Sequence, residues 1–145
     1  MSRSILVVDD EKDLIQLFTK ALQVNGFQVR GFTDSVDAYE HVKQNPKKYG
    51  LVVSDFRMPN LNGNDLCNKL VALNPNLKII IMSAYDNIEY NPIFTFMSKP
   101  VLLTKLLQLV RENLTNKKNI YSLENQSSPT LLHNRTRIYH KIDQE

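Results

Sequence analysis

Short apolar runs alternate with segments of helical periodicity along most of the chain, and this alternation constrains the fold more than any other feature. We expect five strands, at residues 5–8, 27–31, 51–54, 77–82 and 93–97. Runs such as ILVV at 5–8 are apolar enough to be buried on both faces of a sheet. Because parallel strands need crossover connections, the alternation predicts a doubly wound α/β fold, with helices on both faces of a parallel sheet.

Four segments have the signals of helices. Apolar residues recur three and four positions apart at 14–22, 36–42 and 103–114, and a further helix is predicted at 63–73. Asn-Gly or Asn-Pro pairs at 25–26, 45–46 and 74–75 end the first three helices in chain order. Thr33, Asp34 or Ser35 can cap the second helix.

The length of 145 residues predicts one domain, which we place at 1–116, followed by a polar, mildly basic and flexible tail at 117–145. No apolar run approaches the roughly 18 residues of a membrane span, and the start MSRSILVVDD is unlike a signal peptide. We therefore expect a cytoplasmic protein without a membrane partner. The single cysteine, Cys67, lies in an apolar helical pattern and is expected to be a buried core thiol.

The net charge of +3 does not indicate a nucleic-acid partner. Residues 1–116 contain 13 lysines and arginines against 12 aspartates and glutamates, so the domain is almost neutral. A basic stripe with interleaved aromatic residues is missing from the sequence, and the tail is too short for a helix-turn-helix domain. We expect no direct binding of DNA or RNA.

Four of the five expected strands are followed by a residue that can bind a cation or a phosphate. Asp9 and Asp10 follow the first strand and Asp55 the third, while Ser83 and Lys99 follow the fourth and fifth. Taken singly, each has an ordinary explanation as a helix cap, a turn residue, a loop hydroxyl or a solvated lysine. Functional residues of doubly wound folds gather at the carboxyl ends of the strands, so we expect these side chains at one site.

The three acids of this set predict a site for a divalent cation. Asp9, Asp10 and Asp55 would repel one another at close range unless a cation lay between them. A hard ion that takes about six oxygen ligands suits carboxylates without imidazole. Such an ion, together with Lys99, would also compensate the cost of a carboxylate at the end of a buried strand.

These residues resemble the response-regulator receiver domain of two-component signalling, in its single-domain, chemotaxis-regulator-like type. The resemblance extends from residue 4 to about 115. It implies a flavodoxin-like sheet with the strand order 2-1-3-4-5. The motifs that carry the resemblance are Asp9-Asp10, Asp55 with Met58-Pro59 and Gly63, Ser83-Ala84, Phe96 and Lys99-Pro100.

The resemblance implies that Asp55 accepts a phosphoryl group from the phosphohistidine of a sensor histidine kinase or a phosphotransfer protein. It implies Mg²⁺ as the cofactor, held by Asp10, Asp55 and the backbone carbonyl of Arg57, with Asp9 acting directly or through water. The protein would thus be a signalling phosphoacceptor that catalyses only its own phosphorylation and dephosphorylation. Its output would be altered docking to an unknown downstream protein, as a single-domain regulator or a phosphate relay.

The resemblance also assigns roles around the phosphoacceptor. Ser83 and Lys99 would bind the phosphoryl oxygens, as suits a hydroxyl and a point charge. Ser83 and Phe96 would form the switch, in which the hydroxyl moves toward the phosphoryl group and the aromatic ring turns inward. The alternative for Phe96 is a permanently buried core aromatic. Arg57 and Tyr85 would flank the site and tune the lifetime of the acyl phosphate.

The segment between the fourth and fifth strands departs from the family pattern. Only residues 84–92 lie there, whereas a parallel crossover usually needs about a dozen residues or more. We therefore expect the fourth helix of the family to be short or missing. Without that helix, apolar surface of these two strands would be left exposed by the domain itself. We expect either a partner protein or tail residues 131–142 to cover it; the alternative for the tail is disorder.

Two other functions remain open. A constitutive protein-binding module with the same fold, but without physiological phosphorylation, would normally have lost one of the acids or the lysine. All of them are present. A magnesium-dependent phosphohydrolase of the haloacid-dehalogenase type usually has a second acid two residues after its nucleophile, where this chain has Arg57.

Overall fold

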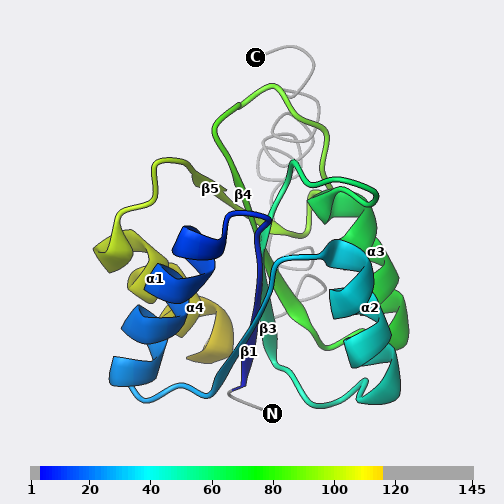
Figure 1. Ribbon diagram of the computed structural model, residues 1–145, viewed down its shortest axis with the longest axis horizontal. Coiled ribbons are helices and arrows are strands. Elements are labelled where there is room, and N and C mark those ends of the chain that lie inside the picture. Colours follow the sequence, from blue (N-terminus) through cyan, green and yellow to red (C-terminus); the bar gives the residue numbers. More distant parts are fainter. Residues whose placement is uncertain (1–3, 116–145) are drawn as a thin grey trace, which may run out of the picture.

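The computed structural model describes residues 4–115, which form five strands and four helices (Figure 1). The strands are β1 (Ile5–Val8), β2 (Val29–Phe32), β3 (Leu51–Asp55), β4 (Lys78–Ser83) and β5 (Thr95–Ser98). The helices are α1 (Lys12–Val24), α2 (Ser35–Gln44), α3 (Gly63–Leu73) and α4 (Leu103–Thr115). All neighbouring strands pair in parallel, in the order β2-β1-β3-β4-β5. This confirms the predicted doubly wound, flavodoxin-like fold.

The sheet lies between two helical layers, with α1 and α4 on one face and α2 and α3 on the other (Figure 1). Successive residues of a strand point to opposite faces, so the fully apolar β1 contributes to both cores. Ile5 and Val7 pack in the cluster that contains α1 and α4 residues, and Leu6 and Val8 pack in the cluster of α2 and α3. The sheet is thereby a rigid support for the loops at its edge.

Two of the helices, α2 and α3, begin at residues whose side chains cap them. Asp34, one of the three candidate caps of α2, accepts hydrogen bonds from the N–H groups of Val36 and Asp37. Asn62 caps α3 in the same way by accepting from the N–H of Asp65 at 2.8 Å. Among residues 4–115, no helix has the length and apolar character that crossing a membrane would require.

Strands β2 and β5 begin two residues later than the sequence predicts. Phe27 and Phe94 are buried, but each lies in the connection before its strand. The N–H of Phe27 donates to the carbonyl of Leu22 at 3.1 Å, and the N–H of Phe94 donates to that of Asn91 at 3.0 Å. Apolar residues of turns that pack into the core cannot be distinguished from strand residues by hydrophobicity alone.

The crossover between β4 and β5, residues 84–94, contains no helix, as predicted. In Figure 1 it is the green loop that extends beyond the upper edge of the sheet. The expectation of exposed apolar surface beneath it is wrong for the described residues, because Ile88, Tyr90 and Phe94 of the crossover itself are buried in the α2 and α3 core cluster. The tail at 117–145 and its suggested covering role lie outside the described residues.

The start of α3 approaches the end of β3 very closely. Gly63, its first residue, donates its N–H to the carbonyl of Phe56 at 2.8 Å. A β-carbon at this position would overlap the backbone carbonyl group of Asp55. The glycine is therefore required by the packing of the two main chains and not by an unusual backbone angle.

Candidate functional site

The carboxyl ends of four strands bring the expected polar residues to one edge of the sheet, the upper edge in Figure 1. Asp9 and Asp10 follow β1 directly, and Asp55 and Ser83 are the last residues of β3 and β4. Lys99 follows the last residue of β5. The parallel pairing of adjacent strands thus produces the juxtaposition, because all their carboxyl ends point the same way.

Three carboxylates form the centre of this edge. Asp9, Asp10 and Asp55 each present a carboxylate oxygen, and these oxygens all lie within 4.8 Å of one another. Asp9 is fully buried, Asp55 is 6% exposed and Asp10 is exposed to solvent. The cluster offers only oxygen ligands, and one side remains open to water. This donor set fits a hard divalent cation such as Mg²⁺, which prefers carboxylates and retains water ligands.

Lys99 neutralises part of this charge. Its Nζ lies 3.1 Å from Asp9 Oδ2 and 3.1 Å from Asp55 Oδ1. Burial acts to lower the pKa of Lys99, but the carboxylates of Asp55 and Asp9 more than offset this effect and raise it. The ammonium group is therefore charged at neutral pH and bridges two buried acids.

Glu11 is a further acid at the site that the sequence interpretation missed. Its Oε1 lies 3.8 Å from Lys99 Nζ, and its N–H donates to Asp9 Oδ1 at 2.9 Å. The backbone bond holds the Asp9 carboxylate with its second oxygen toward Lys99. A signal existed in the sequence, because Glu11 is the third consecutive acid after the first strand.

The pKa of Asp55 is raised from its ordinary 3.8 to about 6. Burial is the main cause, the negative charge of Asp9 adds to it, and Lys99 acts in the opposite direction. Because the folded protein binds this proton more tightly than the unfolded chain, Asp55 favours folding when protonated. Its ionisation opposes folding fully above about pH 6, and this penalty is relieved as the pH falls toward 4.

We expect Asp55→Asn to be more stable than the natural protein, by about 2 kcal/mol at pH 7 in Mg²⁺-free buffer, because it removes a buried charge. The advantage should shrink as the pH falls from 6 to 4. Urea unfolding at several pH values, with chelator present, measures it. Added Mg²⁺ should then stabilise the natural protein more than the variant. A variant less stable than the natural protein at pH 7 would contradict this account.

Ser83 is buried at the end of β4, the strand that pairs with β3 and its terminal Asp55. Its Oγ accepts a hydrogen bond from the N–H of Tyr85 at 3.0 Å, which uses an oxygen lone pair and not the hydroxyl proton. The carbonyl of Ser83 also accepts from the N–H of Lys99 at 2.8 Å, so the ends of β4 and β5 are joined. The Tyr85 ring lies 4.6 Å from the guanidinium carbon of Arg57. Arg57 and Tyr85 thus contact each other at the rim of the site.

Phe96 is placed one layer below this edge. It is half-buried in the α2 and α3 core cluster and pairs with Ile81, two residues before Ser83 on β4. Its ring stacks on that of Tyr90, with centroids 5.5 Å apart. The sequence interpretation did not anticipate Tyr90, because nothing in the pattern of residues 84–92 indicates which of its side chains returns to the sheet.

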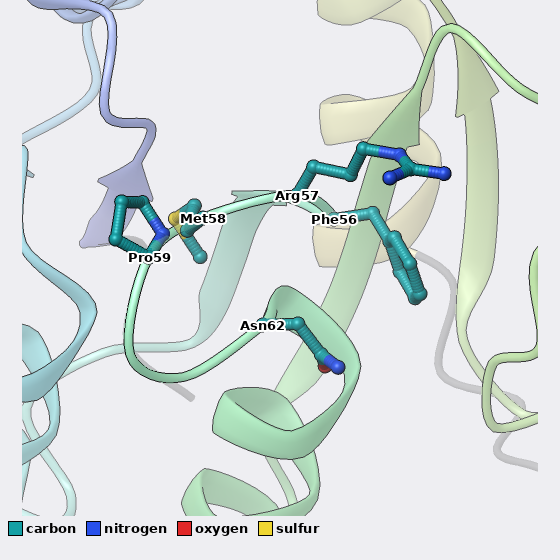
Figure 2. A pocket seen from close by; sticks show the side chains of 5 residues that line it. All are labelled: Phe56, Arg57, Met58, Pro59 and Asn62. Carbon is teal, nitrogen blue, oxygen red and sulfur yellow. The ribbon is translucent and has the colours of Figure 1, made fainter.

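The loop that follows Asp55 borders a cavity of about 440 Å³ that is open to solvent. It is lined by Phe56, Arg57, Met58, Pro59 and Asn62. Figure 2 shows the Arg57 side chain extending away from Met58 and Pro59. Its walls are apolar except for the side chains of Arg57 and Asn62. The lining residues follow Asp55 closely in the sequence.

The sequence profile of the response regulator receiver domain matches residues 5–111. The chain belongs to this family. The transcriptional regulatory protein PgtA of the phosphoglycerate transport system of Salmonella typhimurium is 30% identical to this chain over 134 residues, which cover 88% of the chain and 32% of PgtA. The sensor kinase CckA of Brucella abortus is 31% identical over 119 residues, which cover 78% of the chain and 13% of the kinase. The chain thus spans a third or less of the length of these two relatives.

Smaller relatives and solved structures agree with this assignment. The response regulator receiver protein CpdR of Brucella abortus is 29% identical over 90 residues, 62% of this chain and 73% of CpdR. The crystal structure of the receiver domain of the hybrid histidine kinase CckA superposes with a TM-score of 0.70 at 25% identity, covering 77% of this chain and 99% of that one. A receiver domain from Clostridium thermocellum gives 0.71 at 23% identity, covering 81% and 97%, and shows the shared fold.

Proposed function

We propose that this receiver domain accepts a phosphoryl group on Asp55 from the phosphohistidine of a sensor histidine kinase or a phosphotransfer protein. The observation that carries the proposal is the bridging position of Lys99, 3.1 Å from both Asp55 and Asp9 within a cluster of three carboxylates. A lysine and a cation site beside one buried carboxylate supply the charge that phosphoryl transfer requires. The protein acts in this proposal as a signalling phosphoacceptor and not on a separate substrate.

Asp55 provides the nucleophilic oxygen. A P–O bond forms to its carboxylate as the P–N bond of the phosphohistidine breaks, and the bonding electron pair returns to the imidazole. Lys99 turns from the carboxylates toward the phosphoryl oxygens as their charge enters the site, and Ser83 donates its hydroxyl proton to one of them. Asp10, Asp55 and the Arg57 carbonyl are the proposed ligands of Mg²⁺, with Asp9 acting directly or through water. The bound ion supplies positive charge against the phosphoryl oxygens.

Phosphorylation then alters docking to a downstream protein in the cytoplasm. Ser83 and Phe96 are the proposed switch, and Arg57 and Tyr85, which contact each other at the rim, are the proposed determinants of acyl phosphate lifetime. The proposal requires no direct contact with nucleic acid or membrane. Phosphorylation can shift the equilibrium between the two conformations of such a switch only by the difference in the free energy with which the phosphoryl group interacts with each.

Incubation with a small acyl phosphate donor and Mg²⁺ tests the proposal. We expect a mass gain of one phosphoryl group by intact mass spectrometry, stable to acid and labile to base, and none in Asp55→Asn. Chelation of Mg²⁺ should abolish the gain. An unmodified natural protein, or equal modification of the variant, would reject Asp55 as the acceptor and favour a constitutive binding module with the same fold.

A further inference from the structure

The crossover at residues 84–94 is connected to the site at both of its ends. It begins directly after Ser83 and leads into β5, which is followed by Lys99. The N–H of Lys99 donates to the carbonyl of Ser83, so the two ends are also hydrogen-bonded to each other. A displacement of Ser83 or Lys99 therefore acts directly on this segment, which is joined to both residues.

Asn91 fastens the crossover to α3. Its N–H donates to Oδ1 of Asn64 at 2.8 Å, and its Nδ2 donates to Oδ1 of Asn68 at 2.9 Å. Its Oδ1 accepts from the N–H of Ile93 at 3.1 Å, and its carbonyl accepts from the N–H of Phe94 at 3.0 Å. All four polar groups of this one residue are thus engaged. Asn64 and Asn68 are four positions apart, which places both on the same side of the helix.

Tyr90, the residue before Asn91, is held by this arrangement. Its side chain is 4% exposed and belongs to the α2 and α3 core cluster. Burial raises the pKa of its phenol to about 12. The Tyr90 ring stacks on Phe96 at an interplanar angle of 24°. A segment without helical hydrogen bonds has few constraints of its own, so the position of this ring depends on the residues that anchor its neighbour.

We propose that Asn64, Asn68 and Asn91 form a clamp that keeps Tyr90 on Phe96 and thereby sets how readily the site responds to phosphorylation. The inference rests on the proposed function of Asp55. Asn91 is a positioning residue in it, because it contacts none of the reacting atoms. The clamp takes the place of a crossover helix, as an attachment that two side chains of α3 can make or release.

The clamp opposes the movement on which the proposed switch depends. A phosphoryl group on Asp55 would draw the Ser83 hydroxyl toward the site, and Phe96 could then turn inward only by leaving the Tyr90 ring. By holding Tyr90 in place, the clamp stabilises the unphosphorylated arrangement. Loosening the clamp therefore shifts the population toward the responsive conformation.

Hydrogen–deuterium exchange of the unphosphorylated protein tests the attachment. In Asn68→Ala, the amides of residues 88–91, 93 and 94 should exchange about tenfold faster, because one of the bonds that retain the segment is lost. Asn68→Asp keeps an acceptor for Asn91 Nδ2 and should exchange as the natural protein does. Asn87→Ala is the matched control, since Asn87 is exposed in the same crossover. Equal exchange in Asn68→Ala and Asn87→Ala would overturn the proposal.

The rate of phosphate uptake from the small acyl phosphate donor tests the coupling. We expect about three- to tenfold faster uptake in Asn68→Ala and Asn91→Ala, and the natural rate in Asn68→Asp and Asn87→Ala. A purely structural role would lower the melting temperature and leave this rate unchanged, and that result would overturn the proposal. If the natural protein takes up phosphate and the variants do so at the same rate, the clamp is refuted while the proposed function of Asp55 stands. A complete lack of uptake in every protein, with faster exchange in Asn68→Ala, would refute the function of Asp55 and with it the coupling.

Discussion

Replacing Lys99 with methionine is expected to lower the free energy of unfolding by about 2–4 kcal/mol at pH 7 in Mg²⁺-free buffer. The Lys99 ammonium lies 3.1 Å from both Asp9 and Asp55, and both acids are buried. Removing one partner of a buried ion pair leaves the other uncompensated, and here two like charges would also face each other. The same variant should take up phosphate from the acyl phosphate donor about a hundredfold more slowly, because a cation aimed at the developing charge is lost.

Urea unfolding of Lys99→Met and Lys105→Met, measured in parallel, distinguishes loss of the Lys99 ion pairs from a general effect of removing a lysine. Lys105 is exposed on α4, so its replacement should change stability by less than about 0.5 kcal/mol. The loss in Lys99→Met should diminish as the pH falls toward about 6, because Asp55 without the Lys99 cation takes up its proton at a higher pH than in the natural protein. Millimolar Mg²⁺ should also restore part of it. Equal stability of the two variants would show that the buried carboxylates do not need the Lys99 cation.

Gly63→Ala is expected to destabilise the domain by about 3 kcal/mol or more, although alanine is the better helix former. In an unconstrained helix, this substitution would be favourable by about 1 kcal/mol. Here the new methyl group would overlap the backbone carbonyl of Asp55, which cannot rotate away as a flexible side chain could. The start of α3 would have to move from the end of β3, and overpacking of this kind is costly.

Gly26→Ala provides the comparison, because it tests backbone strain without a steric overlap. Gly26 has a φ of 92°, and a β-carbon added to it would meet no atom within 4 Å, so we expect a loss of only about 1 kcal/mol. Thermal and urea unfolding of both variants, together with phosphate uptake, would measure the difference. A Gly63→Ala protein as stable as the natural one would mean that α3 is free to shift away from β3.

The layer order and the edge location of the site were predictable, because both depend on strong local signals. The apolar runs and the helix-ending Asn-Gly and Asn-Pro pairs determine the number and type of elements, and parallel pairing then brings their carboxyl ends together. Asp9, Asp55 and Lys99 could be expected at one place for that reason. Their 3.1 Å contacts are a property of side-chain packing that no spacing in the sequence records.

The packing of the crossover against the rest of the domain could not be predicted in the same way. Residues 84–94 have no regular periodicity, and the choice of Ile88, Tyr90 and Phe94 as buried side chains depends on the shape of the sheet beneath them. The contacts between Asn91 and α3 join residues more than 20 positions apart in the chain. Polar residues in such a segment have the composition of an ordinary exposed loop, and so their attachment becomes visible only in three dimensions.

The fully buried Cys67 has a practical consequence for studying the molecule. It is the single cysteine of the chain, and burial raises the pKa of its thiol. Thiol reagents require an accessible thiolate, so the folded protein should be inert to them under native conditions. A cysteine introduced at exposed Asn87 could then carry a spectroscopic label without removal of the natural residue. Alkylation of Cys67 itself would report, in turn, that α3 has separated from the sheet.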